Sequence, residues 1–174
     1  MINHKTRNYM KSFCLFLLLA LSMASCSKYE PLLLSRTPYQ GNELRTNGFW
    51  YHVRYSQFEE EPSMNLYFLY RDGTFLRATT VHVTDPSKVT MDSISHQGHD
   101  DFNRQTAWGV FQVEDSVLKW SKWYWQSLGS GHAYLTTLKI LNDTCFKKEE
   151  VEEYYYFYPF DYKPDSTIAR QWIP

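Results

Sequence analysis

Residues 65–83 read NLYFLYRDGTFLRATTVHV, and this stretch decides the fold. Runs of aromatic and β-branched residues, a composition typical of strands, lie on both sides of Asp72-Gly73. An Asp-Gly pair favours the positive φ angles of a two-residue hairpin turn. The stretch therefore predicts an antiparallel hairpin whose strands, 65–71 and 74–83, meet at Asp72-Gly73.

The same composition recurs along the rest of the chain. Aromatic residues make up 18% of the sequence, and this content favours half-buried pleated surfaces. Asp115-Ser116 and Asn142-Asp143 have the chemistry of two further tight turns. Six more runs bounded by turn residues predict strands at 49–55, 107–114, 117–125, 132–141, 144–148 and 153–160.

The connections between these eight strands alternate in length. Short turns join the second strand to the third, the fourth to the fifth and the sixth to the seventh, whereas longer links occupy 56–64, 84–106 and 126–131. In an up-and-down meander, alternate connections lie at opposite ends. We therefore predict an all-β, single eight-stranded up-and-down antiparallel barrel, with one end closed by tight turns and a looped end suited to binding.

Several short motifs resemble those of bacterial lipocalin-like domains. Gly48-Phe49-Trp50 is similar to the lipocalin Gly-x-Trp, and Asp72-Gly73-Thr74-Phe75 lies where such domains carry a hairpin. Residues 109–118 resemble their Gly-x-aromatic turn segment, and Leu141-Asn142-Asp143-Thr144 their late hairpin. The resemblance covers residues 48–160 and implies a lipocalin-like barrel within 44–160.

The resemblance also implies candidate ligand-binding residues. It places Trp50 near the closed end and pointing inward, and alternation then directs His52 and Arg54 inward as well. The same alternation sends Phe49 and Tyr51 outward, an arrangement with three explanations: a polar interior, an outer face covered by linker and tail, or a strand displaced by one residue. The residues expected to bind ligand are Trp50, His52 and Arg54 in the interior, with His82 and His132 near the looped mouth.

The N-terminal region resembles a bacterial lipoprotein signal peptide. A basic start precedes an apolar run over residues 13–24, which is too short to span a bilayer as a helix, and small residues then precede Cys26 as in a lipobox. The resemblance implies a signal peptide over 1–25, a lipidated Cys26, a linker over 26–43 and an outer-membrane address in a Gram-negative envelope. Residues 161–174 form a C-terminal tail in which Asp165 is a candidate helix cap.

Charge and cysteine content narrow the classes of function. The full chain has a net charge of −1, and removal of Lys5, Arg7 and Lys11 with the signal peptide would leave −4. This balance gives no electrostatic footprint for nucleic acid, so membrane attachment would depend on the acyl chains. With Cys26 lipidated and Cys14 removed, Cys145 has no disulfide partner, and we expect it to be a small buried hydrophobe.

No motif for nucleophilic catalysis, zinc-protease chemistry or phosphate binding is found, so we expect neither an enzyme nor a cofactor. His96 and His99, close to Asp100 and Asp101, suit either a polar surface loop, which we favour, or a divalent metal site. We expect a monomer that binds a small molecule or sugar at the looped end. The alternative is a lipoprotein that docks an envelope partner through outer aromatic residues.

Overall fold

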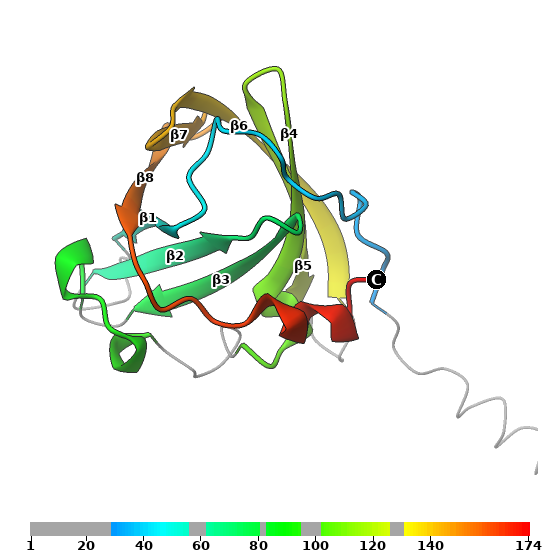
Figure 1. Cartoon of the computed structure of the whole chain (residues 1–174), viewed down its shortest axis with the longest axis horizontal. Coiled ribbons are helices and arrows are strands. Elements are labelled where there is room, and N and C mark those ends of the chain that lie inside the picture. The colour runs from blue at the N-terminus through cyan, green and yellow to red at the C-terminus, as the bar shows by residue number, and fades with distance from the viewer. Residues whose placement is uncertain (1–28, 56–61, 81–82, 95–101, 126–130) are drawn as a thin grey trace, which may run out of the picture.

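The computed structural model describes residues 29–55, 62–80, 83–94, 102–125 and 131–174, and it shows a closed barrel of eight antiparallel strands (Figure 1). Each strand pairs with its neighbours in sequence, and β8 pairs with β1 to close the barrel. The strands are β1 Gly48–Arg54, β2 Ser63–Leu69, β3 Thr74–Thr80, β4 Trp108–Glu114, β5 Val117–Trp125, β6 Gly131–Asn142, β7 Cys145–Lys148 and β8 Glu153–Pro159. The predicted strand number, order and up-and-down topology are confirmed.

Helical structure in the described residues consists of short 3₁₀ turns. η1 Pro86–Lys88, η2 Met91–Ser93 and η4 Gln105–Ala107 lie between β3 and β4, and η5 Ser166–Gln171 lies in the tail. The carboxylate of Asp165 accepts a hydrogen bond from the backbone N–H of Thr167, which confirms its predicted role as a cap. Within the described residues, no helix has the length and apolar character needed to cross a membrane.

The β2–β3 turn differs from the prediction by one residue. The N–H of Gly73 donates to the carbonyl of Tyr70, and the N–H of Tyr70 donates to Thr74, so the loop comprises three residues, 71–73. Gly73 has a φ of 85°, but Asp72 is not among the described residues with positive φ. The predicted two-residue turn is wrong, because Asp72 instead holds Thr74 through hydrogen bonds to its backbone N–H and its hydroxyl.

The closed end of the barrel is packed with aromatic side chains. Trp50 stacks within 4.6 Å of Phe146 between ring centroids, and its indole Nε1 donates to the carbonyl of Arg45 at 3.0 Å. Tyr39 and Leu44, from the segment before β1, complete this packing from outside the strands. The interior cluster comprises Tyr39, Leu44, Trp50, Tyr67, Leu69, Phe75, Phe111, Leu118, Trp120, Leu138, Phe146 and Tyr155.

A second apolar core covers part of the outer face of the barrel. Phe49, which points outward from β1, is fully buried, and Trp108 on β4 is equally inaccessible. Residues 29–34, the η1–η2 segment and the tail pack over these side chains. Two of the three explanations for the β1 pattern therefore apply together: linker and tail cover the outer face, and the interior is polar toward the looped end. The strand is not displaced.

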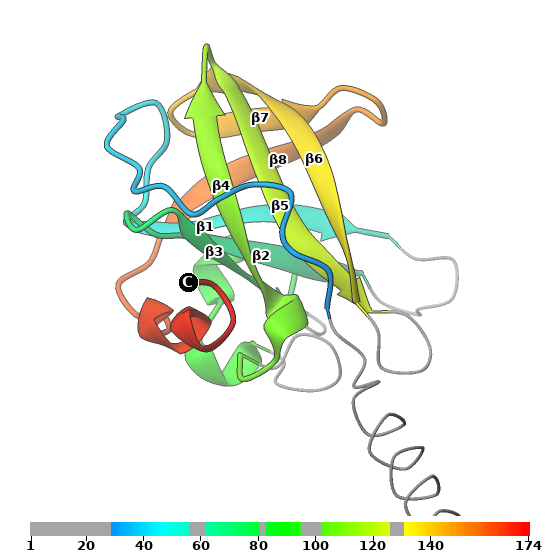
Figure 2. The same ribbon diagram turned by 90° about the vertical axis from the view of Figure 1, so that its right-hand side faces the viewer.

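The segment expected to be a linker is part of this folded unit. It runs from the looped ends of β5 and β6 along the outer face of the barrel to the closed end (Figure 2). Leu32 and Leu34 pack into the outer core, whereas Leu33 is 59% exposed. Cys145 lies on the outer face of β7. The sequence predicted a buried residue, but the side chain is half-buried, and desolvation raises the pKa of its thiol.

Candidate functional site: a polar layer at the looped end

The barrel interior changes from apolar to polar between its two ends. Side chains alternate between the two faces of a strand, so every second residue counted from a member of the interior cluster also faces inward. The register between neighbouring strands gives the same assignment. Toward the looped end these positions carry hydroxyl, amide, imidazole and charged groups. This polar layer consists of His52, Arg54, Asn65, Arg77, Thr79, Lys122, Tyr134, Lys148, Glu153 and Tyr155.

Cations outnumber carboxylates on the inward face. Among the inward positions of the described strands, the charged residues are the four cations Arg54, Arg77, Lys122 and Lys148 and the single carboxylate Glu153. The whole chain has a net charge of −1, so this excess of positive charge is local. An inward cation must be compensated by polar groups or by an anion, because burying an isolated charge is costly.

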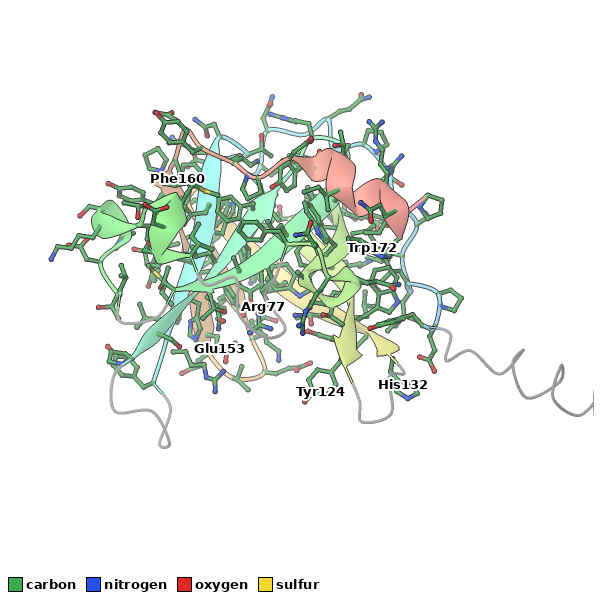
Figure 3. All side chains as sticks on the ribbon, turned by 90° about the horizontal axis from the view of Figure 1, so that it is seen from below. Arg77, Tyr124, His132, Glu153, Phe160 and Trp172 are labelled. Carbon is green, nitrogen blue, oxygen red and sulfur yellow. The ribbon has the colours of Figure 1, made fainter. Side chains whose placement is uncertain are left out.

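Arg77 and Thr79 on β3 share one acceptor. The Arg77 guanidinium donates to Asn65 Oδ1 at 3.1 Å, and the Thr79 hydroxyl donates to the same atom at 3.3 Å. Register explains the contact, because Asn65 pairs directly with Thr79 on the neighbouring strand. Figure 3 shows Arg77 and Glu153 away from Phe160, which follows β8, and from Trp172 in the tail. The shared amide therefore helps to fix the position of the guanidinium.

Lys122 is the most deeply buried cation of the layer, with 6% of its surface exposed. Its register partner on β6 is Tyr134, and the ammonium lies 5.7 Å from the centroid of that ring, within cation–π range. Desolvation raises the pKa of Tyr134 to about 12, which Arg77 opposes electrostatically. The Tyr134 phenol is therefore a protonated hydrogen-bond donor at neutral pH.

The floor of the layer consists of stacked rings. Tyr67 stacks on Trp120 with centroids 4.9 Å apart, and Tyr155 stacks on Phe146 at the same distance. The Tyr155 hydroxyl donates to Glu153 Oε2 at 3.1 Å, and burial raises the pKa of this phenol. Phenol groups from several strands thus lie beside the cations, above an apolar floor.

The predicted residues Trp50 and His52 both lie inward, but in different surroundings. Trp50 is fully buried in the closed-end packing, below the polar layer, so it supports the floor instead of facing the mouth. His52 is half-buried, and its ring lies 5.4 Å from that of Tyr155. Its Nδ1 is 3.2 Å from the carbonyl oxygen of Tyr154, which can only accept, so Nδ1 carries the hydrogen.

The remaining predicted residues lie at the rim or outside the described residues. Arg54 is exposed at the end of β1. His132 is exposed at the start of β6, and its Nδ1 lies 2.6 Å from the carboxylate of Glu30. The structure therefore brings His52 into the layer and leaves Arg54 and His132 at its edge. His82, His96 and His99 fall outside the described ranges.

The sequence analysis missed Arg77 and Lys122. Alternation could have identified them, because each lies two positions from an aromatic residue that faces the interior: Phe75 for Arg77 and Trp120 for Lys122. The argument needs an inward reference residue, and the Gly-x-Trp resemblance supplies one for β1. No group of three His, Cys, Asp or Glu side chains that could hold a metal is present in the described part of the chain.

Comparisons of this chain with protein-family models, curated proteins and solved structures found no match. The barrel geometry and the polar layer are therefore the basis for a functional argument.

Proposed function

We propose that this barrel is a non-catalytic binding module for a small molecule or sugar that bears an acidic group, held at the looped end. The observation that carries the proposal is the inward excess of cations, above all Arg77 and the deeply buried Lys122. A guanidinium presents a planar fork that matches a carboxylate, and an ammonium adds a compact positive charge.

The neighbouring groups suit the rest of such a ligand. The raised pKa of Tyr134 keeps its phenol a donor, and Thr79 adds a hydroxyl near Arg77. At the opposite end, Tyr39 and Leu44 pack against the interior cluster. A ligand therefore enters from the looped end, where long connections surround a rigid scaffold.

Titration with 1-anilinonaphthalene-8-sulfonate, a fluorescent aromatic anion, tests the proposal. We expect saturable binding that weakens with salt and falls about tenfold or more in Arg77→Gln, since a hydrogen bond to a charged group contributes about 1.5–3 kcal/mol. Lys139→Gln is the matched control, because Lys139 is an exposed cation on the outer face of β6. Equal binding by wild type and Arg77→Gln would exclude the polar layer as the site.

We further propose that acyl chains on Cys26 anchor the protein to the outer membrane of the cell envelope. The support is the basic start, the apolar run over 13–24 and the small residues before Cys26. Two acyl signals suffice for stable anchoring, whereas one chain binds only reversibly.

One observation favours docking of an envelope partner as a second candidate function. Tyr154 and Tyr156 stack on the outer face of β8 with centroids 6.4 Å apart, and they are 38% and 47% exposed. Exposed tyrosines are common anchors at protein interfaces. Much of the remaining outer aromatic surface is covered by the chain itself, which reduces the area available to such a partner.

A further inference from the structure

The docking of the N-terminal segment fixes where the chain leaves the folded domain. The N–H of Glu30 donates to the carbonyl of Gly131 at 3.0 Å, and its carboxylate contacts His132 Nδ1 and the N–H of Ala133. The indole of Trp123 donates to the Glu30 carbonyl at 2.6 Å, and its ring meets that of Tyr29 edge to face. Five contacts therefore hold the segment at the looped ends of β5 and β6.

The remaining tether is short compared with the barrel. Three residue steps separate Cys26 from Tyr29, which allows about 10 Å of fully extended chain. β6 has 12 residues and is about 40 Å long at roughly 3.4 Å per residue, and a barrel tilt of about 40° leaves a height on the order of 30 Å. A lipid anchor on Cys26 therefore holds the looped end near the bilayer and the closed end far from it.

A groove beside Tyr29 has a composition suited to a lipid interface. Its volume is about 420 Å³, and it lies between the N-terminal segment, Trp123 and the last residues of the tail. We call it the tether groove, and its main apolar lining residues are Pro31, Leu32, Leu34, Trp123, Trp172 and Pro174. Tryptophan and tyrosine are enriched where membrane proteins meet the headgroup region.

Cations border the tether groove. Arg36 lines it directly, Arg104 is exposed next to the lining residue Gln105, and Arg170 is exposed two residues before Trp172. Glu30 also lines the groove, and its carboxylate is held there by His132 Nδ1 and the N–H of Ala133. Three arginines therefore lie in or next to the groove at which the tether attaches.

Building on the proposed anchor, we propose that the tether groove and its arginine border form a lipid-contact face. This face rests on the anionic surface of the bilayer that carries the Cys26 acyl chains. The barrel therefore stands with the looped ends of β5 and β6 toward the lipid and its closed end toward the solvent. Arginines near an anionic leaflet and apolar side chains at the interface both stabilise this orientation.

Site-specific quenching in vesicles tests the orientation. The acylated protein, with Cys145→Ser as background, carries Pro31→Cys, Leu33→Cys or Leu141→Cys, each labelled with a thiol-reactive fluorophore. Leu141 is the control, because it is 44% exposed at the closed end. In vesicles of phosphatidylethanolamine and phosphatidylglycerol with brominated chains, we expect severalfold stronger quenching at positions 31 and 33 than at 141. Equal quenching at all three positions, or stronger quenching at 141, would overturn the orientation.

A charge reversal tests the arginine border. Arg170→Glu is expected to reduce quenching at position 31, whereas Lys139→Glu, the same change on the outer face of β6, is expected to leave it unchanged. An equal effect of the two reversals would contradict a role for the border. Mass spectrometry of the same samples separates the two proposals: a protein without acyl chains refutes the anchor and this inference together, whereas an acylated protein with equal quenching refutes the orientation alone.

Discussion

Gly73 shows how one residue can serve both a turn and a tertiary contact. Its φ of 85° lies in the left-handed region, and a Cβ atom built on it would overlap the carbonyl oxygen of Thr37 in the segment that crosses the closed end. A side chain at this position therefore strains the turn and displaces backbone that belongs to another part of the fold.

Gly73→Val is expected to lower the free energy of unfolding by more than 1 kcal/mol, because both penalties apply. Ser116→Gly provides the opposite test in another hairpin, since Ser116 has a φ of 63° and glycine should relieve that strain by up to about 1 kcal/mol. Urea denaturation measures both changes. Wild-type stability in Gly73→Val would contradict the observed turn and its contact with Thr37.

Lys163 determines stability at alkaline pH. Its ammonium donates to the carbonyls of Thr46 at 2.7 Å and Leu69 at 2.6 Å, and desolvation lowers its pKa to about 8. Because the unfolded chain keeps the ordinary pKa of about 10.5, the unfolded state binds more protons between these values. Stability should therefore increase from pH 8, by up to about 1.4 kcal/mol per pH unit.

The increase in the free energy of unfolding with pH should end near pH 10. Burial raises the pKa of Tyr39 and of Tyr134 to about 12, so above pH 10 the unfolded state loses phenolic protons first and stability falls. Urea unfolding measured from pH 7 to 11 checks the curve. Lys163→Met should remove the rise between pH 8 and 10, and the exposed control Lys139→Met should retain it. A rise that persists in Lys163→Met would assign the effect to another group.

At the scale of the elements, the strands and their connections were predictable and the packing on the outer face was not. Asp72-Gly73 and Asp115-Ser116 mark turns through local chemistry, so eight strands and their alternating connections could be read directly. The complete burial of Phe49 could not be predicted in this way, because the residues that pack over it, 29–34 and the tail, include segments distant in sequence. The polar layer was predicted in part, through His52, since alternation is local once one inward residue is known.

Phe49 tests whether the outer core stabilises the fold as an interior core does. It is fully buried and packs against Phe68, Tyr158 and Phe160 with centroid distances of 5.4 to 5.9 Å. Phe49→Ala should lower the free energy of unfolding by about 3–5 kcal/mol. Tyr154→Ala, which changes an outward residue of β8 that is 38% exposed, should cost less than about 1 kcal/mol. Similar costs for the two variants would indicate that the cover over Phe49 is loosely held.

At the scale of the whole molecule, the N-terminal segment links three features that the sequence presents separately. It starts three residues after Cys26, it binds the looped ends of β5 and β6 through Glu30, and it supplies Tyr39 and Leu44 to the packing at the closed end. The anchor would therefore be connected to the barrel without a long flexible linker. With so short a connection, the position of the whole domain at the membrane would depend on acylation of Cys26.

Cys26→Ser tests that attachment directly. The substitution removes the thiol that would receive the acyl chain, so we expect the variant to incorporate no labelled palmitate and to leave the detergent phase in phase-separation extraction, where the wild type should remain. Among the described residues, the contacts of the N-terminal segment begin at Tyr29, so we expect thermal unfolding of the extracted protein to be unchanged, which separates loss of the anchor from loss of the fold. Wild-type protein that takes up no palmitate and partitions with the aqueous phase would refute the lipoprotein assignment.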